Sequence, residues 1–250
     1  DREDVTYVQC ESEVHLLKEF LTFWERHTPD IVTGWNTEFF DIPYLCNRIR
    51  NVFDEEEVKR LSPWKNVFAR EVYQMGRTHQ VYTIDGISAL DYFDLYRKFT
   101  YANQESYRLD HIAFVELGER KDGNPHETFR EWYTKDYQSF IEYNIQDVEI
   151  VDRLEDKMKL IELALTMAYD AKVNFTDVLG TVRYWDILIY NYLRERKLVI
   201  PHKKEAEKVE KFEGAYVKDP QVGMHNWVMS FDLNSLYPHI IMQYNISPET

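Results

Sequence analysis

The amino-acid sequence predicts a mixed α/β fold, and two patterns support this prediction. Near the start, an alternating strand-like segment over 5–9 precedes an amphipathic helical segment, and Asp30–Trp35 then has the composition of a short buried strand. Farther along, between Pro125 and Pro201, apolar residues recur every three or four positions, with no proline and almost no glycine. We therefore expect strands and helices to alternate early in the chain and helices to dominate its middle.

The first elements have local start signals. Ser12 is a typical helix cap, and the apolar residues that follow it have helical spacing. A second helix is expected from Asp41 through Ile49, with Pro43 in its first turn, where the missing N–H costs nothing. Alternating segments predict two strands, Val67–Tyr73 and Gln80–Ile84.

Turn and cap residues delimit the elements that come next. Gly76 and Gly86 mark turns beside the two strands, and Asp91 is expected to cap a short aromatic helix. A further helix is expected over 174–196, with Gly180 as an irregularity within it.

The last fifty residues have a different pattern. The charged run His202–Lys211 is typical of an exposed connector and marks a candidate domain boundary. Short strands are expected at Ala215–Val217 and Trp227–Phe231, and a loop and a helix should follow in the segment LNSLYPHIIMQ.

Composition restricts the function classes. The 250 residues are 44% apolar, as in globular proteins, and no apolar run approaches the roughly 18 residues of a transmembrane helix. The 30 Lys and Arg residues against 44 Asp and Glu give a net charge of −14, which by itself argues against nucleic acid as a partner. Cys10 and Cys46 cannot form a disulfide framework, and eight isolated histidines form no zinc motif, so a reducing compartment is expected.

Three carboxylates differ from the other acidic residues because each adjoins an apolar or aromatic segment. Asp41 follows a predicted strand, where a helix cap is the simplest interpretation. Asp147 shares a helix face with Tyr143 and could be an ordinary solvated acid. Asp232 ends the apolar segment WVMSF, where a buried carboxylate would need a partner or a metal ion.

Taken together, these local patterns resemble the motifs of family B DNA polymerases, and in particular the replicative polymerases of T-even-type bacteriophages. The resemblance extends over nearly the whole chain, and its motifs occur in the order that the family uses. Two patterns resemble exonuclease motifs: Asn36-x-x-x-Phe40-Asp41 and Tyr143-x-x-x-Asp147. The first palm motif is resembled by Asp232-x-x-Ser235-Leu236-Tyr237-Pro238. The element that joins the two activities is resembled by Phe212-Glu213-Gly214-Ala215-Tyr216-Val217.

The resemblance implies a ribonuclease-H-like 3'–5' exonuclease domain that uses two divalent ions, Mg²⁺ with Mn²⁺ as a substitute. Such a pair neutralises the scissile phosphate and assists the leaving oxygen, and Mg²⁺ prefers carboxylate ligands. By motif, Asp41 and Asp147 are two of the metal ligands and Tyr143 orients the attacking water. Asn36 and Phe40 would contact the frayed primer end, the ring of Phe40 by packing or stacking, which tolerates any base.

Half of this exonuclease site is expected to be missing. The family's other two carboxylates form an Asp-x-Glu motif roughly a hundred residues before Asp41, and only 40 residues precede Asp41 here. Glu11-Ser12-Glu13 has a similar spacing but is better interpreted as a helix start. The chain opens on Asp1 without a methionine, so we expect a segment of a longer protein.

The palm motif implies a second two-metal site, for nucleotide addition. Asp232 would be a metal ligand, and the Leu233 carbonyl a backbone ligand. The amides of Ser235 and Leu236 would meet the incoming triphosphate, since N–H groups near a helix start favour phosphate. Tyr237, otherwise a core aromatic, would stack beneath the sugar and exclude a 2'-hydroxyl. The second carboxylate motif of the palm is not found in this sequence.

The resulting prediction has three domains: the exonuclease domain at 1–165 without its first strands, a helical connector at 166–211, and the start of the palm at 212–250. Gly214, Ala215 and Tyr216 of the joining element would contact DNA. The expected partners are primer–template DNA, a single-stranded 3' end, deoxynucleoside triphosphates and a sliding clamp, which would bind through a region absent here. The expected location is the cytoplasm, which is the host cytoplasm if the protein is phage-encoded. No membrane partner is expected.

Two other interpretations remain open. The chain could be a stand-alone exonuclease with a vestigial palm-like tail, although a nuclease does not need the Tyr237 motif. It could also be a DNA-binding module with degenerate catalytic sites, in which case Asp41 and Asp147 would bind no divalent ion. Under the leading interpretation the separate 250-residue piece should have little or no polymerase activity.

Overall fold

The computed structural model describes residues 5–74, 76–121, 123, 125–200 and 214–247, and the chain divides into two compact units, Asp1–Pro201 and His202–Thr250. The predicted connector at 202–211 and the first two residues of the joining element, Phe212 and Glu213, lie outside the described residues. The division into domains at 1–165, 166–211 and 212–250 therefore stays a prediction.

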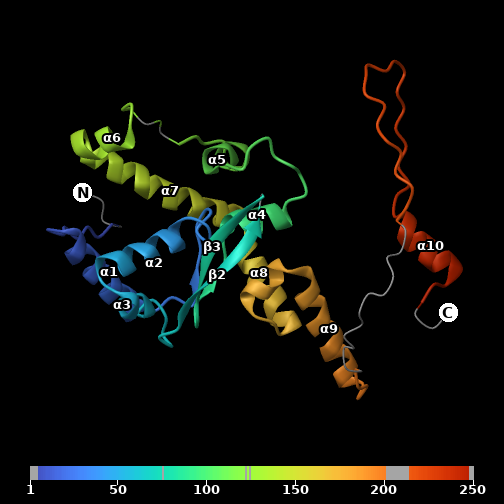
Figure 1. Cartoon of the computed structure of the whole chain (residues 1–250), viewed down its shortest axis with the longest axis horizontal. Helices are drawn as coiled ribbons and strands as arrows, with labels where there is room; N and C mark the ends of the chain where they lie inside the picture. The colour runs from blue at the N-terminus through green and yellow to red at the C-terminus, as the bar shows by residue number, and fades with distance from the viewer. Residues whose placement is uncertain (1–4, 75, 122, 124, 201–213, 248–250) are drawn as a thin grey trace. The chain divides into compact units, whose positions relative to one another are not determined.

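The N-terminal unit mixes helices with short strands, which confirms the predicted α/β class (Figure 1). In chain order its elements are α1 (Glu13–His27), β1 (Ile31–Val32), α2 (Asp41–Val52), α3 (Glu55–Lys59), β2 (Val67–Gln74), β3 (Arg77–Ile84), β4 (Ser88–Ala89), α4 (Tyr92–Phe99), α5 (Leu109–Leu117), α6 (Phe129–Lys135), α7 (Tyr137–Met158), α8 (Leu160–Ala171), the 3₁₀ helix η1 (Phe175–Leu179) and α9 (Thr181–Glu195).

The local start signals act as predicted. Ser12 caps α1 by accepting a hydrogen bond from the backbone N–H of His15 at 3.2 Å. Asp91 caps α4 in the same way, by accepting from the backbone N–H of Phe93 at 3.0 Å. The helix expected from Asp41 is α2, which continues past Ile49 to Val52.

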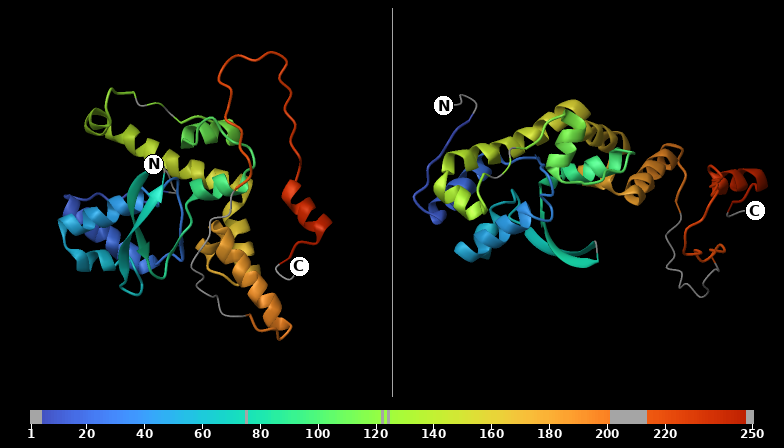
Figure 2. Two further views of the ribbon diagram at one scale, coloured as in Figure 1. Left: turned by 45° about the vertical axis from the view of Figure 1, so that its right-hand side comes forward. Right: turned by 90° about the horizontal axis from the view of Figure 1, so that it is seen from above.

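The strands form two separate pairs in the described residues. Strand β1 is parallel to β4, with Ile31 opposite Ser88, and β2 is antiparallel to β3 from Val67–Ile84 to Gln74–Arg77. Helix α2 packs beside the β2–β3 hairpin (Figure 2). The strand expected over 5–9 does not form, and the one expected over 30–35 is reduced to β1. Alternation alone does not make a strand, because each strand also requires a hydrogen-bonded neighbour.

Gly86 shows why a glycine is needed at one of the predicted turns. Its φ of +89° lies in the left-handed region that side chains disfavour. A Cβ atom at this position would also lie 2.6 Å from Cγ of Pro63. Gly76 has a similar φ of +77°, but the space around it is open.

Two clusters of buried apolar side chains form the core. One joins α4, α5, α7 and α8 through residues such as Leu95, Ile112 and Ile150. The other joins α1, α2, α3 and β3 and contains Leu21 and Cys46, both fully buried. The predicted helical middle of the chain therefore supplies one face of the first cluster.

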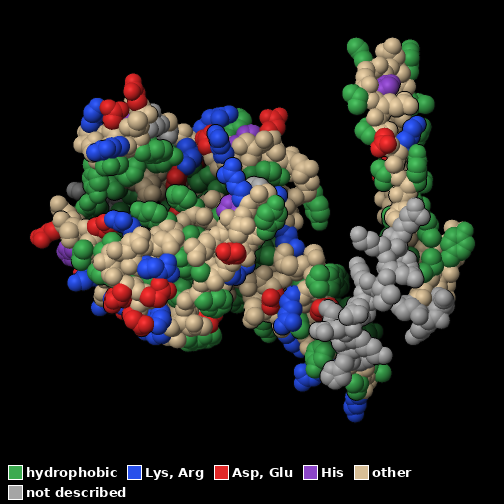
Figure 3. Space-filling model, in the orientation of Figure 1, with side chains coloured by type: hydrophobic (Ala, Val, Ile, Leu, Met, Phe, Trp, Pro, Cys, Tyr) green, Lys and Arg blue, Asp and Glu red, His purple; other side chains and the backbone are tan. Residues whose placement is uncertain are grey.

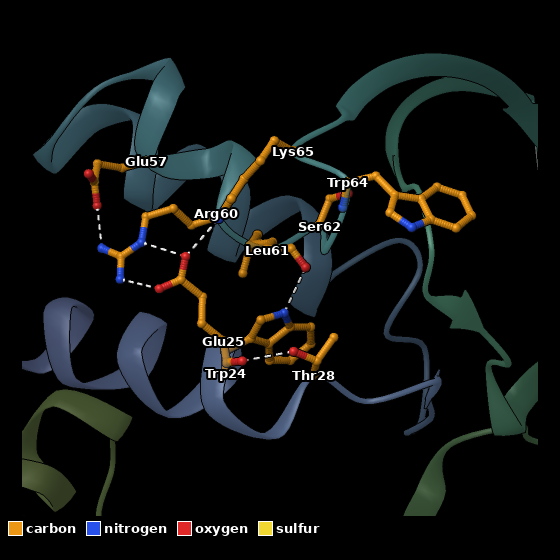
Figure 4. A network of polar contacts seen from close by, with 9 residues as sticks. All are labelled: Trp24, Glu25, Thr28, Glu57, Arg60, Leu61, Ser62, Trp64 and Lys65. Atoms are coloured by element: carbon orange, nitrogen blue, oxygen red, sulfur yellow. Dashed lines mark hydrogen bonds and ion pairs between the residues drawn. The ribbon is translucent and has the colours of Figure 1, made fainter.

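Figure 4 shows the polar contacts that join α1 to the segment after α3. Nε1 of Trp24 donates to the carbonyl oxygen of Leu61 at 2.7 Å, and Glu25 pairs with Arg60 at 2.7 Å and with Lys65 at 2.8 Å. Hydrogen bonds from Arg60 and then Lys65 hold the pKa of Glu25 at about 2, below its ordinary 4.5. These contacts fasten the C-terminal end of α1.

The helical middle is interrupted at two points. The left-handed conformation of Lys159, with φ of +55°, separates α7 from α8. The helix expected over 174–196 is in fact η1 followed by α9, with Gly180 between them. A capping box between Asn174 and Asp177 starts η1, and the extended backbone of Gly180, with φ of −93° and ψ of 136°, ends it before α9 begins.

The described part of the C-terminal unit, 214–247, contains one helix, α10 (Leu236–Tyr244), which was predicted. The strands expected at Ala215–Val217 and Trp227–Phe231 are wrong, because neither segment has ladder partners among the described residues. Their apolar side chains are exposed, as Figure 3 shows for this unit. A buried strand needs a neighbouring strand and a covering layer, and the described part of this unit has neither.

Candidate functional site

The loop between β1 and α2 is held against the chain that leads into α4. The parallel pairing continues past β1, because the N–H of Leu90 donates to the carbonyl of Val32 at 2.9 Å and that of Tyr92 to Gly34 at 2.8 Å. Trp35 then packs on aromatic rings of α4 and donates from Nε1 to the Tyr107 carbonyl at 3.1 Å. This anchoring places the Asn36–Asp41 motif at the end of the strand pair.

Asp41 is the first residue of α2, and its N-cap is Phe40. The interpretation of Asp41 as a helix cap is therefore wrong. The residue as a whole is exposed, and its partly buried carboxylate forms no ion pair with a described residue. Partial burial raises its pKa, the backbone N–H of Asp41 opposes the shift, and the negative charge of Asp91 adds to it. A carboxylate in this setting is open to a cation.

Asp147 lies on α7 one turn after Tyr143, and both residues contact Lys121 from the α5–α6 loop. Nζ of Lys121 is 2.5 Å from Oδ1 of Asp147 and 4.8 Å from the ring centroid of Tyr143. Burial lowers the pKa of Lys121, but hydrogen bonds to Asp147 and Tyr143 raise it overall, so the ammonium stays charged. Asp147 is thus no ordinary solvated helix acid.

One cavity of about 460 Å³ brings the two exonuclease-motif carboxylates together. The start of α2 contributes Asp41 to the lining, and α7 contributes Asp147 together with other polar and apolar side chains. The lining residues are Thr33, Gly34, Trp35, Thr37, Asp41, Leu109, Asn144, Asp147, Val148, Val151, Asp152, Glu155 and Ile161. The two predicted ligands are far apart in sequence and meet only through the packing of the fold.

The other exonuclease-motif residues lie beside this cavity and do not line it. Tyr143 packs against Trp132, with ring centroids 4.9 Å apart. Phe40 is 63% exposed and stacks on Tyr44. Asn36 is exposed and has a left-handed backbone with φ of +68°, which asparagine tolerates. The exposed ring of Phe40 and the exposed amide of Asn36 are therefore accessible to a ligand that enters the acidic cavity from solvent.

The side chains at the cavity supply only part of the ligands that a divalent cation requires. Oδ1 of Asp147 is buried, and apart from the Lys121 ammonium no described group donates to it. No group of three or more potential metal-ligating side chains occurs within the described ranges. Two carboxylates facing one cavity match the oxygen preference of Mg²⁺ but leave further positions to other ligands.

The segment that imitates the Asp-x-Glu spacing has a structural role. Ser12 caps α1, and Glu13 pairs with Arg48 of α2 through both oxygens. The interpretation of Glu11-Ser12-Glu13 as a helix start is confirmed.

The palm-motif residues lie together in the C-terminal unit around the start of α10. Ser235 is the N-cap residue and has a left-handed φ of +54°, and its carbonyl accepts from the N–H of His239 at 3.1 Å. Asp232, Leu233, Leu236 and Tyr237 are all exposed. The joining-element residues of this unit that are described are likewise exposed: Gly214, Ala215 and Tyr216.

Lys121 is the functional candidate that the sequence did not indicate. It stands in a polar loop, GERKDGNP, with no motif of its own, and its partners Tyr143 and Asp147 come more than twenty residues later. Its importance follows from side-chain geometry alone.

Comparisons with protein families match the two end portions of the chain. Residues 1–112 match the family described as DNA polymerase family B, exonuclease domain, and residues 181–250 match DNA polymerase family B. No described helix has the length and apolarity that a bilayer crossing requires.

Individual relatives align over almost the entire chain. The DNA-directed DNA polymerase of Escherichia phage RB69 is 44% identical over 248 residues and that of Enterobacteria phage T4 is 41% identical over 249, each over 98% of this chain. DNA polymerase 1 of Pyrococcus abyssi is 27% identical over 99% of it. The chain spans 27% of the length of each phage relative and 32% of the archaeal one. The chain therefore belongs to DNA polymerase family B, with the exonuclease domain of that family in its first half.

Proposed function

We propose that this chain is part of a replicative DNA-directed DNA polymerase and carries most of its 3'–5' proofreading exonuclease domain. The observation that supports the proposal is the shared cavity of Asp41 and Asp147, the acidic residues of two motif patterns that are distant in sequence. The names of the phage relatives, DNA-directed DNA polymerases, agree with it.

In the proposed exonuclease, Asp41 and Asp147 hold the divalent ions, Mg²⁺ with Mn²⁺ as a substitute, together with ligands outside this sequence. When bound, such ions activate a water and stabilise charge on the scissile phosphate. Lys121 keeps Asp147 oriented and adds positive charge where a phosphate would enter. Tyr143, held between Trp132 and Lys121, presents its phenol as the group that orients the attacking water.

The surface beside the cavity supports the proposed substrate, a single-stranded 3' end. Phe40 and its neighbour Tyr44 form an exposed aromatic surface on which a base can stack without sequence preference. Asn36, on the same loop, would bind the terminal nucleotide through its amide. A frayed single-stranded 3' end, rather than a paired one, leaves its bases free for such stacking.

In the C-terminal unit we assign Asp232 and the Leu233 carbonyl to metal binding for nucleotide addition. The Ser235 and Leu236 amides at the start of α10 would bind the triphosphate of the incoming deoxynucleotide, and Tyr237 would select against a 2'-hydroxyl. The joining element, Gly214 to Tyr216, would contact the primer–template.

The net charge of −14 is compatible with this function because phosphate contacts are local. Lys and Arg side chains are interspersed with acidic ones on the face shown in Figure 3. We further propose a sliding clamp as a partner, bound outside this sequence. We propose the cytoplasm as the location, which is the host cytoplasm if the protein is phage-encoded.

The test is 3'–5' degradation of a labelled single strand by a full-length polymerase that carries this sequence. Asp41→Ala and Asp147→Ala should each reduce the degradation rate by about a hundred-fold or more, with primer extension retained. Asp152→Asn is the matched control, because Asp152 lines the same cavity but belongs to no motif, and it should retain the rate within about two-fold. Unchanged degradation in both alanine variants would overturn the proposal.

A further inference from the structure

Asp91 receives more hydrogen bonds than a helix cap requires. The residue is 2% exposed, and one of its donors is the N–H of Phe93 in α4, at 3.0 Å. The other three donors come from the β1–α2 loop: the N–H of Asn36 at 2.8 Å, the N–H of Glu38 at 3.1 Å and Oγ1 of Thr37 at 3.4 Å. A buried carboxylate is costly unless such donors surround it, so Asp91 and the loop depend on each other.

The loop that Asp91 holds is the one that begins α2. The N–H of Phe40 donates to the carbonyl of Asn36 at 3.1 Å, and that of Ile42 donates to Thr37 at 3.0 Å. Asn36, whose N–H donates to Asp91, has a left-handed backbone. The backbone that carries Asp41 into the cavity is therefore fixed at its start by one buried carboxylate.

We propose that Asp91 is a positioning residue of the exonuclease site: by binding the 36–38 loop, it sets the place of Asp41 in the shared cavity. Asp91 does not line that cavity, so its effect on a bound cation passes through the loop. The inference rests on the proposed role of Asp41 as a metal ligand.

Serine at position 91 separates the two roles of this carboxylate. In Asp91→Ser the hydroxyl can still cap α4, since serine is among the best N-cap residues, but it is too short and has too few acceptor sites to replace all three loop contacts. Asp54→Ser is the matched control, because Asp54 caps α3 through the N–H of Glu57 at 3.0 Å and no loop donor reaches it among the described residues.

The experiment measures Mn²⁺ binding by electron paramagnetic resonance, and the Mn²⁺ dependence of single-strand degradation, in the full-length polymerase. The part of the binding that Asp41→Ala removes reports the exonuclease site. Asp91→Ser should weaken that binding and raise the Mn²⁺ concentration for half-maximal degradation, each by about ten-fold, as for other groups that orient metal ligands. Asp54→Ser should leave both values unchanged.

Two outcomes separate the inference from the function on which it rests. If Asp41→Ala changes neither Mn²⁺ binding nor degradation, the proposed function fails. If Asp41→Ala abolishes both while Asp91→Ser keeps wild-type Mn²⁺ dependence, the proposed function stands and Asp91 is only a helix cap. Should Asp91→Ser fail to fold, Asp91→Asn, which retains the shape and one oxygen, takes its place with the same expected direction, and wild-type Mn²⁺ dependence in that variant would overturn the inference.

Discussion

Replacing Glu25 by glutamine should make the N-terminal unit less stable, and the effect should depend on pH. Glu25 accepts from Arg60 and Lys65, and these contacts, Arg60 first, lower its pKa from 4.5 to about 2. A depressed carboxyl pKa contributes stability above the unfolded pKa, and the contribution is lost as pH falls through the folded one. The contribution of Glu25 should thus be complete above about pH 5.5 and should disappear between pH 4.5 and about pH 2.

The size of the effect follows from the same contacts. At about 1.4 kcal/mol per pH unit, the full lowering would correspond to about 3 kcal/mol. The side chain of Glu25 is 35% exposed and that of Lys65 is 57% exposed, so solvent screens both pairs. We therefore expect about 1 kcal/mol near pH 7.

Urea unfolding of the chain, followed by tryptophan fluorescence between pH 3 and 7, measures this contribution. The variant Glu56→Gln is the matched control, because Glu56 in α3 pairs, among the described residues, with Lys59 alone and is 77% exposed. It should cost less than about 0.5 kcal/mol at every pH. Equal losses in Glu25→Gln and Glu56→Gln at pH 7, or a loss in Glu25→Gln that is as large at pH 3 as at pH 7, would refute the reasoning.

Three further predictions address single features. Lys121→Met should slow single-strand degradation by about ten- to a hundred-fold, because Asp147 loses the cation that orients it. The control Lys135→Met removes an exposed pair with Glu131 and should not slow degradation, so equal rates in both variants would contradict the role of Lys121. Gly86→Ala should lower the free energy of unfolding by about 2 to 3 kcal/mol and Gly76→Ala by about 1 kcal/mol, because both positions have a positive φ but only a Cβ at position 86 would clash with Pro63. Urea unfolding measures both losses, and equal losses would contradict this prediction. Burial raises the pKa of Cys46 to about 12, so a thiol reagent at pH 8 should react only with Cys10 in the native chain and with both thiols in denaturant; rapid native labelling of Cys46 would contradict its burial.

Local signals in the sequence were sufficient for most helices. Ser12 and Asp91 cap α1 and α4, and apolar periodicity placed α7 and α10, because capping and helical spacing act within a few residues of the chain. The strands were less predictable. The segments at 5–9, Ala215–Val217 and Trp227–Phe231 have strand-like sequences but no ladder partner in the described structure, whereas β4 pairs with β1 without having been expected.

The candidate site divides in the same way. The sequence by itself determined the family, through motifs around Asp41, Tyr143 and Asp147, since each motif is a short run of residues. Only the tertiary structure decided that Asp41 and Asp147 share a cavity and that Lys121 pairs with Asp147. The sequence predicted Asp91 as a helix cap, and the tertiary structure adds hydrogen-bond donors from the loop between β1 and α2. Contacts between residues so distant along the chain depend on how α2, α4 and α7 pack, and no local pattern encodes that packing.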